Sequence, residues 1–215
     1  RLEQIKVTGN YQVSANRLDI PGGVPTLEQI AGRIDFSESN LSARGVSAQL
    51  LGGAAIINLT ARGDDKVEVQ ATGSANVAAL RKYFALPFAE RASGDALWQS
   101  TLHAGKDGLD LSVESNLSGV AISLPRPLGK RAGEAVPFKL EYSDRADAPF
   151  LRQSGAPRLE TGADAFMVTL DSRASALIVR RKSTAGYQLD RGAIGLGEPR
   201  PALNRAGLAI AGKFD

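Results

Sequence analysis

Apolar and polar residues alternate along most of the chain, which is the pattern of β-strands with one face turned toward an apolar environment. In the first stretch one parity carries the apolar residues Ile5, Val7, Tyr11, Val13 and Ala15. Gly9-Asn10 lies inside this stretch, either as a turn or as a bend within one long strand. The residues from 27 to 36 repeat the alternation. Thr26 could cap a helical turn there, but the continuation through Phe36 favours a strand.

Glycine-containing turns separate the strands that follow. Residues 52–53 (Gly-Gly) precede one strand, and residues 63–65 (Gly-Asp-Asp) separate it from the next. In that next strand Val67 and Val69 share a face, and the residues between them are polar. Residues 104–109 ("AGKDGL") predict a further turn between two strands. Each of these segments therefore has one apolar and one polar face.

In the stretch "NVAALRKYFALP" the spacing of the apolar residues changes from every second residue to the three or four residues typical of a helix. Val77, Leu80 and Phe84 lie on one helical stripe, after Asn76 as an N-cap and before Pro87. This stretch predicts one short helix.

Within residues 108–143, the apolar residues move from odd-numbered to even-numbered positions. Leu111, Val113 and Leu117 come before this change, and Val120, Ile122 and Leu124 come after it. A single apolar face survives only if Ser118-Gly119 forms a bulge or a bend, because one extra residue exchanges the two faces. After Pro137, Phe138 and Leu140 alternate again with charged residues.

The last third of the chain predicts a long connection and then four strands. The connection spans residues 144–163, is rich in Asp, Ala, Pro and Gly, and has room for a short helix. The four strands lie within residues 165–172, 174–182, 186–197 and 207–215, with a proline-bearing loop at 198–205. We expect residues 1–215 to form one β-rich segment, with possible sub-repeats over 1–75, 76–145 and 146–215.

About a dozen strands with short turns predict a mainly β protein built on a large curled antiparallel sheet, with one or two short helices. Parallel α/β architecture is disfavoured because helices do not alternate with the strands. A dozen strands about 4.8 Å apart would extend roughly 55 Å, so the sheet must curl, split or close. An open groove and a sandwich-like packing both satisfy this requirement.

Composition narrows the classes of function. Twenty-six basic and 23 acidic residues leave a charge of only +3, which argues against a nucleic-acid partner. Two short basic clusters, at 126–131 and 179–183, are either solvated strand edges or a docking patch for anionic head groups. The absence of cysteine excludes disulfides and thiolate metal sites. The start without Met or signal peptide suggests a segment of a longer protein, and no apolar run is long enough to cross a bilayer.

Residues that could carry chemistry are few. His103 is the only histidine, and we interpret it as a partly exposed imidazole at the end of a strand. We expect no zinc site of the common kinds, no other metal site and no cofactor. The carboxylates at 64–65 and at Asp107 and Asp110 lie beside turns, where such side chains bond the local backbone. Trp98 is typical of a core anchor rather than of a ligand platform. We therefore expect no enzyme, although a glycan-active β-sandwich with two converging carboxylates stays an alternative.

Three stretches resemble the AsmA-like superfamily and, within it, its YhdP branch. Within residues 41–84, one strand rich in small residues ends at Gly-Gly, and the next strand carries "LTARG". Residues 92–143 contain a Trp followed by "LSGVAISLPRPLGK", and residues 191–215 complete the likeness. The resemblance runs from about residue 27 to the end and is most specific at 119–130 and 191–212.

The resemblance implies a segment of a large protein of Gram-negative bacteria. Such proteins are anchored in the inner membrane by an N-terminal helix that this stretch lacks, and most of the chain lies in the periplasm. They resemble bridge-like lipid transfer proteins, whose curled sheet offers an apolar groove to phospholipid acyl chains. The family is implicated in moving phospholipid toward the outer membrane and in its permeability barrier, without enzyme activity. Other segments of the same chain and envelope proteins are the further partners it implies.

The apolar parity supplies the candidates for a lipid-facing role. They are Val67, Val69, Leu111, Val113, Phe138, Leu140, Val168 and Leu170. Two alternatives stay open at this point. The same parity could pack under a second sheet or the helix, and the chain could be a non-catalytic interaction module of the bacterial envelope with a closed β-sandwich core.

Overall fold

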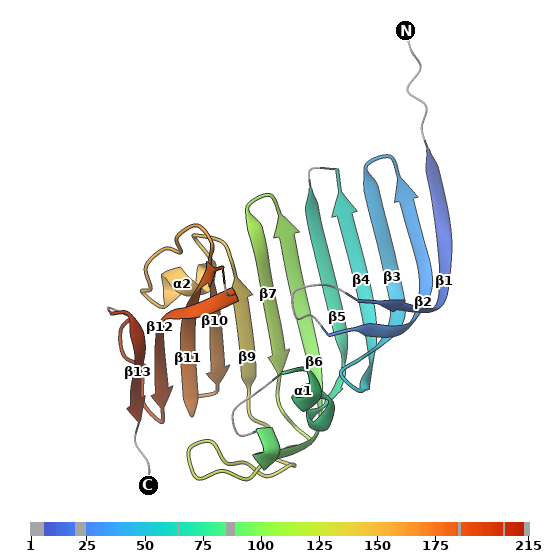
Figure 1. The fold of residues 1–215 in the computed structure, drawn as a ribbon. Helices are drawn as coiled ribbons and strands as arrows, with labels where there is room; N and C mark the ends of the chain where they lie inside the picture. Colours follow the sequence, from blue (N-terminus) through green and yellow to red (C-terminus); the bar gives the residue numbers. More distant parts are fainter. Residues whose placement is uncertain are drawn as a thin grey trace.

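The computed structural model describes residues 7–19, 25–63, 65–84, 89–184, 186–203 and 205–212. Its strands form one open sheet in which neighbours in sequence are neighbours in space (Figure 1). The strands are β1 (Thr8–Leu18), β2 (Leu27–Ser37), β3 (Asn40–Leu50), β4 (Gly53–Arg62), β5 (Lys66–Asn76), β6 (Ala92–Gly105), β7 (Gly108–Ser115), β8 (Val120–Ile122), β9 (Phe138–Ser143), β10 (Ala163–Leu170), β11 (Ala174–Ser183), β12 (Gly186–Leu196) and β13 (Gly207–Gly212).

The sheet order is β1-β2-β3-β4-β5-β6-β7-β9-β10-β11-β12-β13, and β8 pairs with the start of β6. The mainly β architecture predicted from the alternation is confirmed, and the described strands form a single open sheet rather than two packed ones. The prediction of antiparallel pairing is wrong for the last pair, because β13 runs parallel to β12. A short hairpin turn cannot join parallel strands, so a longer connection lies between Leu196 and Gly207.

The predicted helix is α1 (Val77–Tyr83), which follows directly on β5. The side chain of Asn76 accepts hydrogen bonds from the backbone N–H groups of Ala78 (2.9 Å) and Ala79 (3.2 Å), so the expected N-cap is confirmed. A short 3₁₀ helix, η1 (Ala89–Arg91), leads into β6.

The parity change after β7 is a break in the strand rather than a bulge within it. β7 ends at Ser115, the chain turns with Gly119 at φ 98°, and β8 pairs back onto β6. A Cβ on Gly119 would lie 2.2 Å from the carbonyl oxygen of Asp95, so the close approach of the two segments requires glycine here. The apolar residues of β8 therefore do not continue the face of β7.

Lys130 holds the loop between β8 and β9. Its ammonium donates to the carbonyl oxygens of Leu117 (3.0 Å), Val120 and Arg131 (3.0 Å), and only 7% of the residue is exposed. Burial lowers the pKa of Lys130 from its usual value. The reading of the cluster at 126–131 as a solvated edge is therefore wrong for Lys130, which ties backbone carbonyls together.

A second layer covers one side of the sheet at β10–β12. The connection after β9 contains α2 (Pro149–Gln153), as its length allowed, and packs over these strands (Figure 1). The buried cluster contains side chains of this connection (Ala148, Phe150, Leu151 and Leu159), Leu203 from the loop before β13, and side chains of the strands beneath (Ala163, Ala165, Leu177, Val179 and Ala193). This is the compact core of the described chain.

Two hairpins bend away from the direction of their strands (Figure 1). The register between β1 and β2 shifts after Val13, where Ala15 takes φ 52°. The register between β11 and β12 shifts between Val179 and Arg180. Bulges of this kind increase local twist and re-aim the residues that follow. In the described part of the chain, no helix is long and apolar enough to cross a membrane.

Candidate functional site

One row of directly opposite residues crosses the whole sheet. Residues that oppose one another in register lie on the same face, so the row defines a face. From β1 to β13 it contains Tyr11, Ile34, Ala43, Leu59, Val69, Leu102, Leu111, Tyr142, Phe166, Ile178, Gly192 and Leu208. Its twelve members include no charged side chain. We call the side of the sheet that carries this row the apolar face.

A second row runs beside the first on the apolar face. From β3 to β13 it contains Val46, Ile57, Ala71, Ser100, Val113, Leu140, Val168, Ala176, Ile194 and Ile210. Ser100 is its one polar member. The two rows make a band of aliphatic and aromatic side chains across β3–β13.

The structure brings all eight residues proposed from parity onto the apolar face. Val69 and Leu111 belong to the first row, and Val113, Leu140 and Val168 belong to the second. Val67 extends the face beside the β4–β5 turn, where it opposes Ala61 and Ala104. Phe138 and Leu170 oppose one another at the other end of the strands. The register thus brings side chains from four strands, β5, β7, β9 and β10, onto one face.

These eight side chains are half-buried, and none is fully covered. Toward the sheet edges the face is more open: 61% of Tyr11 and 60% of Ile210 are exposed. The buried cluster under α2 contains none of the eight, because it lies on the other side of β10–β12. The second layer that was the alternative for these residues therefore lies on the opposite face.

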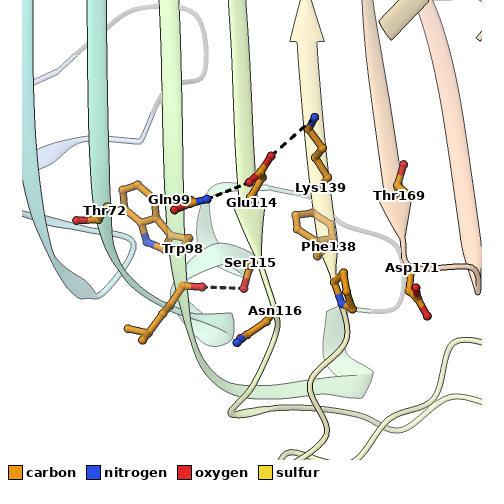
Figure 2. A pocket seen from close by; sticks show the side chains of 12 residues that line it. Thr72, Trp98, Gln99, Glu114, Ser115, Asn116, Phe138, Lys139, Thr169 and Asp171 are labelled. Carbon is orange, nitrogen blue, oxygen red and sulfur yellow. Dashed lines mark hydrogen bonds and ion pairs between the residues drawn. The ribbon is translucent and has the colours of Figure 1, made fainter. Parts of the chain in front are cut away.

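The opposite side of β4–β7 and β9 is polar, and we call it the polar face. Gln99 donates to Glu114 (2.9 Å), and Lys139 pairs with Glu114 (3.7 Å) and Glu141 (3.1 Å). Figure 2 shows Gln99, Glu114 and Lys139 among the residues that line a hollow of about 530 Å³. Leu97, 73% exposed, lines the hollow together with Pro137. An apolar spot within a polar surface is a feature that the sequence analysis missed.

Trp98 packs on the apolar face rather than in a closed core. A Cβ on Gly73 would lie 2.9 Å from its ring, so the glycine makes room for the indole. The ring nitrogen is buried without a hydrogen-bond partner among the described residues. The sequence prediction of a core anchor is thus only partly right, because the ring borders the open face.

The sequence analysis also missed a charged and aromatic cluster at one end of the apolar face. Asp164 opposes Arg180 in register, and the two form an ion pair of 2.7 Å. Phe166 and Tyr187 each lie with their ring centre 4.5 Å from the Arg180 guanidinium. The reading of the cluster at 179–183 as a solvated edge is therefore wrong for Arg180. A period-two pattern carries no signal for this pairing, because the two residues belong to different strands.

The residues weighed for catalysis lie apart from the apolar face. His103 is exposed on the polar face, between Glu68 and Asp110 in register. Asp110 accepts a hydrogen bond from Ser143 (2.6 Å) and pairs with Arg145 (3.2 Å). Asp64 lies outside the described residues. In the part of the chain that the structure describes, no cluster of three or more His, Cys, Asp or Glu side chains could hold a metal ion.

Comparison with family models gives a match to the YhdP protein model over residues 2–215. The chain belongs to the YhdP family. Comparisons with curated proteins and with solved structures gave no match. The resemblance read from the sequence is therefore confirmed, and YhdP membership suggests an envelope protein.

Within this YhdP-family chain, the most specific sequence stretch has a structural role. Residues 119–130 include Gly119, which allows β8 to approach β6, and Lys130, which binds three carbonyl oxygens. Arg173, at the β10–β11 turn, donates to the carbonyl of Gly129 (3.1 Å) and pairs with Glu134. These contacts hold the segment between β7 and β9 in place at one end of the sheet.

Proposed function

We propose that the apolar face carries the acyl chains of phospholipids, and that this chain is a segment of a bridge-like lipid transfer protein. One observation carries the proposal: a band of apolar side chains crosses the sheet from strand to strand, and most of its members remain partly exposed. Membership of the YhdP family points to the same class of function. The route would lead between the inner and outer membranes and support the outer-membrane permeability barrier.

The physical basis is the transfer of hydrocarbon from water to an apolar surface. Burial of apolar area is favourable by roughly 25 cal/mol per Å², or ~0.8 kcal/mol for each buried CH₂ group. Twelve strands at about 4.8 Å spacing give a track of about 53 Å, before curvature. Aliphatic walls make few polar contacts and therefore accept chains of different structure. An acyl chain lying on the two rows would replace the water that now contacts them.

The remaining parts of the proposal follow from this role. Transfer of a lipid along a surface breaks no covalent bond, so this role requires no catalytic residue and no cofactor. The segment would act in the periplasm as part of an inner-membrane-anchored protein, with other segments of that chain and envelope proteins as partners.

Lipid capture by the purified 215-residue chain tests the proposal. We expect native mass spectrometry to detect co-purified phospholipid, and a fluorescent phospholipid to bind with an emission change typical of an apolar site. The chain after delipidation in detergent and refolding should rebind the same probe. A protein that is free of lipid on purification and also rejects the fluorescent phospholipid would contradict the proposal.

The open edges of the sheet favour a second candidate function. Among the described strands, β1 and β13 each pair on one side, so each presents unpaired backbone groups on the other. Such edges add strands from partners. An interaction module that joins neighbouring segments is therefore a candidate beside lipid transfer. Crosslinking that captures partners through β1 or β13 without any lipid binding would favour it.

A further inference from the structure

The guanidinium of Arg180 is fixed on the apolar face by three neighbours. Its Nε and Nη2 donate to the two carboxylate oxygens of Asp164, at 3.0 and 2.7 Å. The rings of Phe166 and Tyr187 each lie 4.5 Å from the guanidinium carbon. A planar cation held by a two-point ion pair and by aromatic rings has little freedom to reorient. Arg180 is thus pre-organised, while a third of its side chain is exposed.

Asp164 explains why the cation stays in place. Only 1% of its side chain is exposed, and an unpaired carboxylate there would be very costly. The ion pair with Arg180 also raises the pKa of that guanidinium. The ring of Tyr142 lies 4.9 Å from that of Phe166 between ring centres, tilted by 53°, and its phenol belongs to the same cluster. The group of Tyr142, Asp164, Phe166, Arg180 and Tyr187 is therefore built around a buried charge.

The cluster ends the apolar rows at one end of the strands. Along β10 the apolar-face residues are Leu170, Val168 and Phe166, and then Asp164. On β5, in contrast, the same face stays apolar up to Val67. An amphipathic molecule whose chains lie on Val168 and its row would bring its polar end to Arg180. The boundary between hydrocarbon and polar groups thus coincides with a fixed cation.

Arg180 keeps hydrogen-bonding capacity for a ligand. A guanidinium has five N–H donors, and the two bonds to Asp164 use one at Nε and one at Nη2. The remaining donors include both on Nη1. Planar guanidinium groups suit phosphate oxygens because they donate two parallel hydrogen bonds.

We propose that Arg180 binds the phosphate of a phospholipid head group, and so selects phosphate-bearing lipids and orients them on the apolar face. This inference rests on the proposed function. The aromatic rings and Asp164 act as positioning groups that hold the guanidinium toward the lipid.

The test uses the double variant Asp164→Asn/Arg180→Gln, which removes both charges together and leaves no unpaired carboxylate. The probes are fluorescent phosphatidylglycerol and fluorescent diacylglycerol with the same acyl chains. We expect the double variant to bind phosphatidylglycerol about tenfold more weakly, equivalent to ~1.4 kcal/mol, and to bind diacylglycerol unchanged. Arg180→Lys, which keeps the charge but loses the planar fork, should show part of this loss.

The matched control is Arg181→Gln, on the same strand and the opposite face, where Arg181 pairs with Glu160 at 2.7 Å. It should leave both affinities unchanged. Equal loss for both lipids, or loss for neither, would overturn the phosphate assignment while lipid binding stands. A wild-type chain that binds neither lipid would instead overturn the proposed function itself.

Competition with inorganic phosphate distinguishes a lipid head group from a free phosphate ion as the ligand of Arg180. Millimolar phosphate should not displace phosphatidylglycerol, because the acyl chains supply most of the binding free energy. Binding of inorganic phosphate by the lipid-free wild type, with the same affinity as phosphatidylglycerol and lost in the double variant, would assign Arg180 to a free anion and overturn its role in lipids.

Discussion

The two halves of the sheet use the same apolar face but different opposite faces. In β4–β7 the opposite face carries Asn58 and Gln70, which oppose each other in register and are exposed. The same row continues into β10–β12 as Met167, Leu177 and Ala193, which lie under α2 and its flanking loops. The alternation of β4 and β5 thus gives way to strands that are apolar on both sides. Strands of that kind need cover on one of them.

The two sides of β10–β12 differ in how far their side chains are buried. Burial is complete on the covered side of β10–β12, where Ala165, Leu177 and Ala193 are 0% exposed. On the apolar face of the same strands Phe166, Val168 and Ile178 remain half-buried, whereas in the N-terminal half Ala43, Val46 and Ala71 are buried. Packing against α2 therefore stabilises the C-terminal half on one side and leaves the apolar face of β10–β12 partly exposed. The three predictions that follow test this division.

The largest effect should come from the covered side. Leu177→Ala should lower the free energy of unfolding by about 3 kcal/mol, since it removes a fully buried side chain and leaves a cavity. Leu111→Ala, the same change on the half-buried apolar face, should cost about 1 kcal/mol. Urea unfolding followed by circular dichroism measures both. Equal losses would mean that a covering layer also protects the apolar face.

Charge on the apolar face should affect lipid binding more than folding. Val69→Asp and Leu111→Asp should each weaken binding of a fluorescent phospholipid at least tenfold, because an acyl chain would have to desolvate the carboxylate. The fold should survive, since both positions reach water. Gln70→Asp, next to Val69 and on the polar face, is the control and should bind normally. Unfolding of both apolar-face variants would instead indicate a closed core.

The smallest effect should be a loss of stability at alkaline pH. Burial, followed by the nearby charge of Asp164, raises the pKa of Tyr142 to about 12. The unfolded chain releases this proton near pH 10, so between about pH 10 and 12 the folded state binds more protons than the unfolded state. Stability from Tyr142 is therefore present below pH 10 and is lost as the pH rises to 12.

Phenolate absorbance titration and unfolding measured across this range check the prediction. Tyr142→Phe should flatten the dependence of stability on pH between 10 and 12, whereas Tyr11→Phe, at the exposed β1 edge, should not. A normal ionisation of Tyr142 would show that the aromatic cluster is open to water.

Much of the apolar face could be predicted from the sequence. Val67 and Val69, or Leu111 and Val113, share a face because side chains alternate along a strand with a period of two. The turn glycines and the Asn76 cap are similarly local. The expected sub-repeats over 1–75, 76–145 and 146–215 stay a prediction.

The sequence by itself determined the strands, their turns and which residues of each strand share a side, because these depend on neighbouring residues and on backbone stereochemistry. The tertiary structure decided which strand faces align and which side α2 covers. It also decided that β13 runs parallel to β12 and that Lys130 and Arg180 are held rather than solvated. The reason is physical: register, layer packing and ion pairs join residues far apart in sequence, and their free energy depends on the geometry of the assembled sheet.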